Sequence, residues 1–254
     1  ALDPTRFTPL RIREVHNVSP DTKAFDVLLP HEDDLSGLVT SAFIMRATLS
    51  QVKGADDEAR PYTPVSPTDQ RGWLRLVIKA YPGGAVSSHL HTLRSGDYML
   101  VKGPFFKLKY VSNQYKHIGM IAGGTGVTPM LQIIKEIIKN PGDSTTAHLL
   151  FQSRSENDIN ILREEIDDIV ARHSNISVTY ILSQPSAAWK GLRGRLDAAL
   201  LAETMPPPSE QSPPLLYVCG PPGMLEAVAG SKAADKSQGE LTGLLKDAGY
   251  SGES

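Results

Sequence analysis

The clearest structural signal in this chain of 254 residues is Ile118-Gly119-Met120-Ile121-Ala122-Gly123-Gly124-Thr125-Gly126-Val127-Thr128-Pro129. An apolar run of buried-strand length leads into glycines, and apolar residues then recur at helical spacing as far as Lys139. Thr128 is expected to cap this helix, with Pro129 at its first position. A glycine turn between a strand and a helix suits a phosphate, because backbone N–H groups and the helix dipole point at it. The glycine spacing is not the standard one, and such turns also occur without a ligand.

Strands and helices alternate after this turn. We expect strands at 148–152, 176–182 and 215–219, and helices at 129–139, 160–173, 222–230 and after the capping-box sequence Ser237-Gln238-Gly239-Glu240. Alternation of this kind implies a parallel sheet, in which ligands bind outside the carboxyl ends of the strands. A second loop, Cys219-Gly220-Pro221-Pro222-Gly223-Met224, is therefore expected on the same edge as the first glycine turn.

The chain before His117 has a different pattern. Short alternating runs separated by turn signals predict strands at 9–17, 22–29, 43–49, 73–81 and 98–102. Many short strands with turns between them favour a small antiparallel barrel. We therefore predict two domains, an N-terminal antiparallel β-barrel over residues 1–113 and a C-terminal α/β domain with a parallel sheet over 114–254.

Within the predicted barrel, the segment Arg60-Pro61-Tyr62-Thr63-Pro64-Val65-Ser66 is stiff, because each proline fixes its own φ and restricts the residue before it. In an extended strand Arg60, Tyr62 and Pro64 share one face. A permanent cation beside an aromatic ring suits a ligand with a phosphate and a flat ring system. An edge strand with an exposed arginine and a packed tyrosine explains the same residues equally well.

The segment Gly83-Gly84-Ala85-Val86-Ser87-Ser88-His89-Leu90 is a second candidate anion site. Two glycines let the backbone approach a ligand, and Ser87 or Ser88 is able to cap a short helix whose free N–H groups face an anion. A diphosphate held between Arg60 and this helix would explain both segments. The alternative is a Gly-Gly turn followed by an ordinary capped helix.

Composition excludes several classes of function. With 26 basic and 28 acidic residues, the net charge of −2 gives no general attraction to nucleic acid. Cys219 is the single cysteine, so an intrachain disulfide and a cysteine-based zinc site are excluded, and no His or Asp near it in sequence would activate it as a nucleophile. We expect instead a small polarisable side chain beside a ligand ring. Because the chain begins at Ala1, an N-terminal leader or membrane anchor is expected to be missing.

The four segments 60–66, 83–90, 123–129 and 219–224 come in the order and spacing of the ferredoxin-reductase-type flavoproteins, and the chain most resembles the NADH–cytochrome b5 reductase family. The segments SQGELTGLLKDAGYS (237–251) and GPFFKLKY (103–110) resemble its fungal mitochondrial branch. The resemblance implies that the barrel holds FAD and that the second domain holds NADH or NADPH. It also implies hydride transfer from the nicotinamide to FAD, and then single-electron transfer to cytochrome b5 or a similar haem protein.

The resemblance also implies roles for individual residues. Thr63, close to flavin N5, and Cys219, at the nicotinamide, are the expected catalytic residues, and Lys79 is expected to face the incoming nucleotide. The FAD site would comprise Arg60, Pro61, Tyr62, Thr63, Val77, Ile78, Lys79, Tyr81, Gly84, Ala85, Val86 and Ser87. The nucleotide site would comprise Gly124, Thr125, Gly126, Thr128, Ser183, Cys219, Gly220 and Pro221. No metal is expected.

One position departs from the family pattern in a way that affects the nucleotide. Family members carry an acidic residue after the strand 176–182, where a carboxylate favours NADH by repelling a 2′-phosphate. This chain has Ser183 there, with Lys190, Arg193 and Arg195 close behind. NADH is the expected substrate from the family, and NADPH is the alternative that these residues suggest.

The resemblance suggests a haem-protein partner with an acidic face, so the lysines at 102, 107, 109 and 116 are a candidate docking cluster. The expected protein is a monomer in mitochondria, at the outer membrane or in the intermembrane space, with the cytosolic face of the endoplasmic reticulum as an alternative. Two other interpretations stay open. The chain could be a module of a larger electron-transfer enzyme such as a nitrate reductase, or a two-domain binding protein without turnover.

Overall fold

The structure is a computed structural model that describes residues 2–38, 41–43, 45–48, 59–209, 211–234 and 237–252. The chain forms two compact units. The first contains Ala1–Tyr110 together with Leu131–Glu136, and the second contains Val111–Met130 and Ile137–Ser254. The division of the chain after Tyr110 lies three residues before the boundary predicted at 113.

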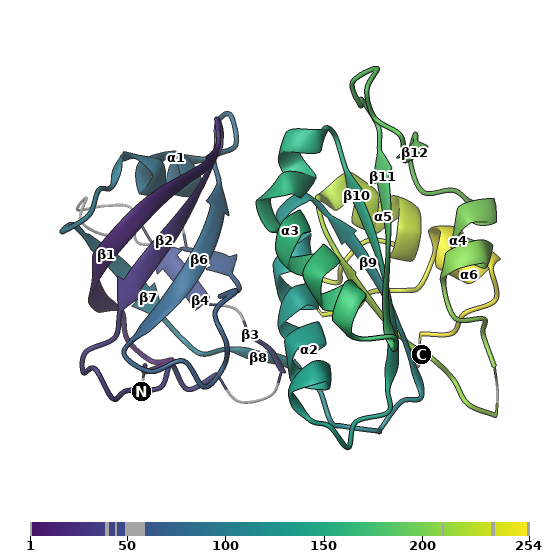
Figure 1. Ribbon diagram of the computed structural model, residues 1–254, viewed down its shortest axis with the longest axis horizontal. Coiled ribbons are helices and arrows are strands. Elements are labelled where there is room, and N and C mark those ends of the chain that lie inside the picture. Colours follow the sequence, from purple (N-terminus) through teal and green to yellow (C-terminus); the bar gives the residue numbers. More distant parts are fainter. Residues whose placement is uncertain are drawn as a thin grey trace. The chain divides into compact units, whose positions relative to one another are not determined.

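The first unit is a curled antiparallel sheet (Figure 1). Its strands are β1 (Thr8–Ser19), β2 (Thr22–Leu28), β4 (Met45–Thr48), β5 (Ala59–Tyr62), β6 (Trp73–Lys79) and β7 (Tyr98–Lys102), in the spatial order β5-β4-β7-β1-β2-β6. A second antiparallel pair joins β3 (Ser41–Phe43) to β8 (Phe106–Lys109), and α1 (Ala85–Thr92) follows β6. Buried residues such as Leu10, Phe25 and Leu76 form the core. The predicted antiparallel barrel is thus confirmed as a half-barrel.

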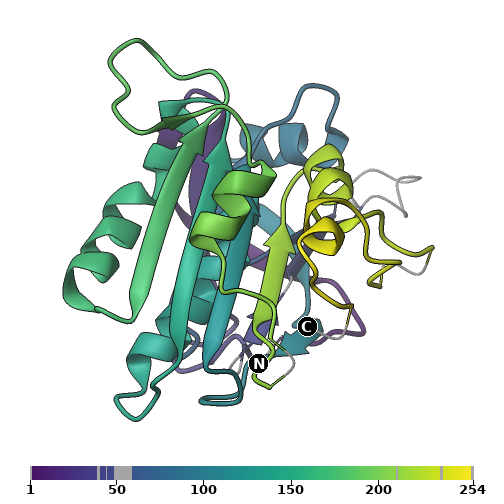
Figure 2. The same cartoon turned by 90° about the vertical axis from the view of Figure 1, so that its right-hand side faces the viewer.

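The second unit is a five-stranded parallel sheet in the order β12-β11-β10-β9-β13. Helices α4, α5 and α6 pack on one face and α3 lies on the other, as Figure 2 shows. In chain order the elements are β9 (His117–Gly123), the 3₁₀ turn η1 (Gly124–Gly126), α2 (Val127–Lys139), β10 (Thr146–Ser153), α3 (Glu156–Arg172), β11 (Ile176–Leu182), β12 (Leu192–Arg193), α4 (Ala198–Thr204), β13 (Leu215–Cys219), α5 (Pro222–Ala229) and α6 (Gly243–Asp247). The predicted α/β domain is confirmed.

The register of the parallel sheet brings the two predicted loops to one edge. Gly123 at the end of β9 pairs with Gln152 on β10, and Cys219 at the end of β13 pairs with Ala122 on β9. All these strands run in the same direction, so their carboxyl ends lie side by side. The shared edge expected from the sequence is confirmed.

The start of α2 differs from the prediction. Helical structure begins in the 3₁₀ turn at Gly124, and α2 has Gly126 as its N-cap, so Thr128 is a first-turn residue and not the cap. Its hydroxyl donates a hydrogen bond to the Thr125 carbonyl at 3.1 Å. Gly126 already has helical backbone angles (φ −63°, ψ −8°), and it packs against the neighbouring loop described below.

Two other helix starts also differ. The capping-box sequence 237–240 begins no helix, and α6 starts only at Gly243 with Thr242 as its N-cap. A Cβ on Gly239 would lie 2.2 Å from the Ser231 carbonyl, so this segment packs tightly against the chain after α5. Helix α3 begins four residues earlier than predicted, because Ser155 and Asp158 form a true capping box there.

Candidate cofactor sites

The first half-site begins at the end of β5. Arg60 is exposed and its Nη1 donates to the Ala59 carbonyl at 3.2 Å, while Tyr62 is half-buried against the core of the first unit. The strand ends at Tyr62, and Thr63 is 7% exposed in the irregular segment that follows. The strict alternation that would have sent Tyr62 and Thr63 to opposite faces therefore stops between them.

The electrostatics of Tyr62 place two sequence-distant segments together. Burial raises the pKa of Tyr62 to about 12, the charge on Arg60 opposes this rise, and Tyr81 adds to it. The charge on Arg60 and the Tyr81 hydroxyl thus both influence the Tyr62 hydroxyl, which relates the Arg60 segment to the turn before α1.

The N-terminus of α1 is the candidate anion-binding element. Gly83 has φ of +76°, and Gly84 is the N-cap without any side-chain cap. A Cβ on Gly84 would lie 2.7 Å from the Ser87 Oγ, so only glycine fits there without movement. Ser87 is the third helical residue and not the expected cap: its hydroxyl donates to the Gly84 carbonyl at 3.2 Å. The first-turn N–H groups are left for a ligand, which fits a phosphate group.

The other residues predicted for the FAD site lie in varied surroundings. Ile78 is fully buried in the core of the first unit, so its side chain is not presented to a ligand, and Val86 belongs to the same core. Lys79 makes an ion pair with Asp21 at 3.1 Å (Nζ to Oδ2). Val77 is buried on β6, whereas Pro61 and Ala85 are exposed.

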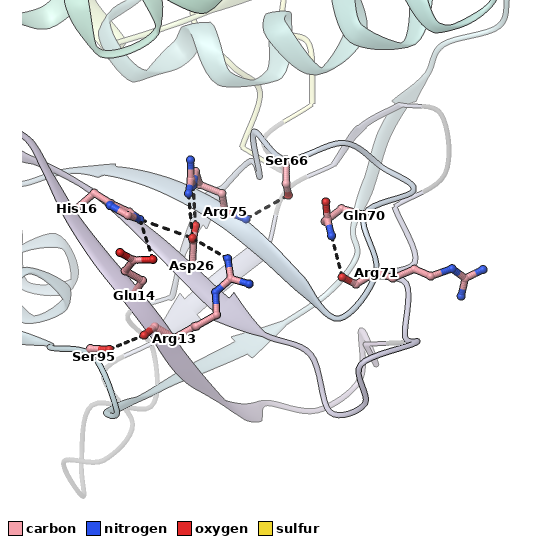
Figure 3. A network of polar contacts seen from close by, with 9 residues as sticks. All are labelled: Arg13, Glu14, His16, Asp26, Ser66, Gln70, Arg71, Arg75 and Ser95. Carbon is pink, nitrogen blue, oxygen red and sulfur yellow. Dashed lines mark hydrogen bonds and ion pairs between the residues drawn. The ribbon is translucent and has the colours of Figure 1, made fainter.

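A buried carboxylate supports the segment after Thr63 (Figure 3). Asp26 is 1% exposed, and its carboxylate accepts hydrogen bonds from Arg75 Nε (2.6 Å to Oδ1) and from Arg13 Nη2 (2.9 Å to Oδ2). The backbone of Arg75 in turn bonds the next part of the Arg60 segment: its N–H donates to Ser66 Oγ at 3.1 Å, and its carbonyl accepts from Val65 at 2.9 Å. Asp26 is thus a structural centre that links β1, β2 and β6 to the segment 60–66.

The same centre contains the one group of metal-type ligand atoms found among the described residues. Glu14, His16 and Asp26 each offer an atom, and these atoms lie within 4.8 Å of one another. Two guanidinium groups already occupy the Asp26 oxygens and would repel a cation. Burial alone would raise the pKa of Asp26, but hydrogen bonds and charges from Arg75 and Arg13 lower it below its usual value, so the carboxylate is ionised.

The second half-site is built from backbone. A Cβ on Gly126 would lie 2.2 Å from the Cys219 carbonyl oxygen and 2.9 Å from the Gly220 nitrogen, so the two loops touch and only glycine fits. Gly124 has φ of +54°. The first helical hydrogen bonds here are donated by the Val127 N–H to the carbonyls of Gly124 and Thr125, so the helix N-terminus begins at this turn. This glycine cradle fits the diphosphate of a dinucleotide.

Cys219 ends β13 beside this cradle. Burial raises the pKa of the Cys219 thiol and the charge on Lys232 offsets this only in part, so the thiol is protonated at neutral pH. A protonated thiol is a poor nucleophile, which agrees with a packing role. Pro221 is the N-cap of α5, and a Cβ on Gly220 would lie 2.7 Å from Met224 Cε.

The loop after β11 is held by its own contacts. Arg193 donates to the carbonyls of Ser186 (3.0 Å) and Trp189 (2.9 Å), and is therefore engaged within the loop instead of being available to a phosphate. Arg163 on α3 lies over the rings of Trp189 (5.3 Å) and Tyr180 (5.2 Å). A cavity of about 930 Å³ borders this stack. Lys190 and Arg195 are exposed, and so stay candidate cations.

Ser183 itself lies beside two residues that the sequence argument missed. Its N–H donates to the Ser153 carbonyl at 3.0 Å, and the Gln184 N–H donates to the Arg154 carbonyl at 2.8 Å. Ser153 ends β10 and Arg154 follows it directly. A polar pair at the carboxyl end of a predicted strand was the available signal, whereas Ser183 was singled out by its departure from the family pattern.

Two family models match the chain: an oxidoreductase FAD-binding domain over residues 9–110 and an oxidoreductase NAD-binding domain over residues 120–230. The protein is therefore an oxidoreductase with one domain for FAD and one for NAD. It is 42% identical over 245 residues to NADH-cytochrome b5 reductase 2 of Meyerozyma guilliermondii, with 96% of this chain and 82% of that protein covered. A cytochrome b5 reductase-like protein of Arabidopsis thaliana is 40% identical over 255 residues, covering 100% and 77%. The chain belongs to the NADH-cytochrome b5 reductase family.

Solved structures agree with this assignment. The cytochrome b5 reductase domain of Ulva prolifera nitrate reductase superimposes with a TM-score of 0.79 at 30% identity, over 89% of this chain and 91% of that one. In the described part of the chain, no helix is both long and apolar enough to cross a membrane. Of the predicted lysine cluster, Lys102 lies over the Phe7 ring (5.4 Å) and Lys116 is exposed, while the side chains of the lysines at 107 and 109 lie outside the described residues.

Proposed function

We propose that this protein is a cytochrome b5 reductase, which takes electrons from NADH and passes them singly to cytochrome b5 or a similar haem protein. The observation that carries the proposal is the pair of half-sites, a cation with two aromatic rings and a helix N-terminus on one unit, and a glycine cradle on the other. The fungal relatives named as NADH-cytochrome b5 reductases support the choice of donor and acceptor.

FAD, when bound, accepts a hydride from reduced nicotinamide and releases electrons one at a time. The residues of the chain bind and orient the reactants. Arg60 and the first turn of α1 would hold the FAD diphosphate, Tyr62 would pack on the ring system, and Thr63 would offer a buried hydroxyl near it. Gly124, Thr125 and Gly126 would hold the nucleotide diphosphate. Cys219 would present a small neutral side chain to the nicotinamide, so no acid–base pair is needed.

The test uses the FAD-loaded protein. Anaerobic addition of NADH should bleach the yellow flavin band, and cytochrome b5 added next should show the absorbance of reduced haem. A flavin that stays oxidised in excess NADH would overturn the proposal and favour a binding protein without turnover. Loss of rate between low and high ionic strength would support a lysine docking surface for the haem protein.

A second candidate is a reductase module of a larger enzyme, which the likeness to the nitrate reductase domain favours. Isolation of the protein from its source separates the two. A haem absorbance band that copurifies on the same polypeptide supports the module, and a yellow protein without haem supports the free reductase. Mitochondrial location, membrane anchoring and the monomeric state stay predictions from the resemblance.

The choice between NADH and NADPH is open to a direct measurement. Ser183 removes the carboxylate that would repel a 2′-phosphate, so we expect kcat/KM for NADPH within about tenfold of that for NADH. An NADPH efficiency lower by several orders of magnitude would restrict the enzyme to NADH.

A further inference from the structure

We propose that Ser153, Arg154 and Ser183 form a subsite for the phosphate monoester of a 2′-phosphorylated nicotinamide nucleotide, with Arg154 as the selecting residue. The proposal rests on the proposed function of the second unit and names its nucleotide specificity. Three observations on the described part of the chain carry it: a buried hydroxyl with no hydrogen-bond partner there, an arginine with no acidic partner there, and the hydrogen bonds that bring both residues beside Ser183.

The buried hydroxyl belongs to Ser153. This residue is 7% exposed, and its Oγ has no hydrogen-bond partner among the residues that the structure describes. A buried polar group without a partner is unfavourable, so such groups usually meet a ligand or a water. Ser153 is the last residue of β10, at the carboxyl edge of the sheet between the strand that carries the glycine cradle and the strand that precedes Ser183. A ligand group on this edge would satisfy it.

The arginine is Arg154. Two successive hydrogen bonds, from Ser183 to the Ser153 carbonyl (3.0 Å) and from Gln184 to the Arg154 carbonyl (2.8 Å), hold the two segments against each other. Arg154 is exposed, and within the described ranges no acidic group pairs with its guanidinium. A guanidinium binds phosphate through two parallel hydrogen bonds, which a lysine cannot reproduce. Arg154 is therefore placed to bind a phosphate that extends past Ser183.

Two charged residues near Ser183, Arg193 and Glu156, are engaged by the loop after β11. Arg193 donates to loop carbonyls. Glu156 on α3 accepts from the Ser186 N–H at 2.9 Å and from the Ser186 hydroxyl at 2.6 Å, and these bonds lower its pKa. The negative charge of Glu156 is thus engaged by the two Ser186 donors and is also attracted by the positive Arg193. Lys190 borders the cavity of the loop and is the competing cation.

The experiment measures kcat/KM for NADPH and NADH with ferricyanide as acceptor, on the FAD-loaded protein. Arg154→Gln should lower the ratio of NADPH to NADH efficiency about 10- to 100-fold, because a charge-assisted contact to the 2′-phosphate is lost. Lys190→Gln should lower the ratio less than about threefold. Arg11→Gln, which removes an exposed arginine from the first unit, is the remote control.

Two additional variants test the serines. Ser183→Asp should lower the ratio of NADPH to NADH efficiency by at least about tenfold, since it introduces a carboxylate that repels the phosphate. Ser153→Ala should lower NADPH efficiency several-fold while leaving the melting temperature unchanged or raised, because its hydroxyl has no hydrogen-bond partner among the described residues. A purely structural Ser153 would instead lower the melting temperature in this variant.

Three results would overturn the subsite: equal losses for both nucleotides in Arg154→Gln, equal effects of Arg154→Gln and Lys190→Gln on the ratio, or an unmodified enzyme that turns over NADH but not NADPH. Failure of the proposed function looks different, because then neither nucleotide reduces the bound flavin. Inhibition by adenosine 2′,5′-bisphosphate gives a second readout: Arg154→Gln should weaken it, with little change in inhibition by adenosine 5′-monophosphate.

Discussion

Arg60 and Tyr62 offer a ligand a charge and a ring, whereas the loop Gly123–Gly126 offers mainly backbone N–H groups. The first half-site is made by side chains that project from a strand. Asp26 supports the residues that follow this strand, because it binds Arg75, whose N–H donates to Ser66. The second half-site depends on how closely two loops approach each other. Side-chain sites are expected to lose affinity by degrees when one contact is removed. A backbone site fails abruptly, because an added atom has no room.

The most severe test of this contrast is Gly126→Ala. The new Cβ would lie 2.2 Å from the Cys219 carbonyl oxygen, so the two loops must separate. We expect kcat/KM for NADH to fall by about 100-fold or more while FAD stays bound. Gly223→Ala is the matched control, since no atom lies within 4 Å of a Cβ there. Equal activity of the two variants would remove the idea of a backbone cradle.

Asp26→Asn tests the support behind the side-chain site. The substitution leaves two guanidinium groups without a buried carboxylate, and we expect the free energy of unfolding to fall by about 3 kcal/mol at pH 7. Asp168→Asn breaks an exposed pair with Arg172 and should cost less than about 0.5 kcal/mol. Urea denaturation measures both.

The effect of Asp26 should depend on pH in one direction. Because its folded pKa is lowered, its contribution is present above the unfolded value of about 3.9 and is lost as the pH falls through the folded pKa. The stability difference between the original protein and Asp26→Asn should therefore shrink below about pH 4. A difference that stays constant from pH 7 to pH 3 would show that the charge of Asp26 contributes nothing.

Arg60→Gln should produce the graded loss expected of a side-chain site. We expect the dissociation constant of FAD to rise about 10- to 30-fold, because one charged contact to the diphosphate is removed and the α1 N-terminus remains. The loss should be smaller at high salt. Fluorescence titration with FAD measures it, with Arg11→Gln as the control. An unchanged FAD affinity would assign Arg60 to an ordinary edge strand.

The smallest effect is expected at Cys219→Ala. Because burial raises the pKa of this thiol, it carries no charge near neutral pH, and its loss removes volume and not a nucleophile. We expect kcat with NADH to change by less than about tenfold. The pH profile between 6 and 8 should keep its shape. A loss of several orders of magnitude would contradict the packing role.

Sequence reasoning succeeded where one local pattern determines the structure. The strands 98–102, 176–182 and 215–219 have the predicted bounds, because each is a short apolar run bordered by turn residues. The cap at Thr128 was wrong because a contact with a loop about 90 residues away sets the start of that helix. Asp26 was not foreseen, since its partners Arg13 and Arg75 meet it only through the register of three strands.

Some features of the candidate site could also be predicted from the sequence, and others could not. The order of glycine turns and strands in the sequence located both half-sites, and the structure brings Tyr81 to Tyr62 and Gly126 to Cys219. Strand alternation places Ile78 on the same face as Leu74 and Leu76, and all three are buried in the core, whereas the resemblance had assigned Ile78 to the FAD site. The sequence could not show that Arg193 is engaged by carbonyls, because this depends on the direction of one side chain, which charge counting does not determine.

The contacts that shape the loop after β11 involve Arg163, Trp189, Glu156, Ser186 and Arg193, and none of them uses the side chain of Ser183. The contacts that hold the loop are thus separate from the side chain at the proposed phosphate subsite. A substitution at position 183 is therefore expected to leave the shape of the loop unchanged. If the proposed subsite is correct, the nucleotide preference of this chain can change in one mutational step, at little cost to folding.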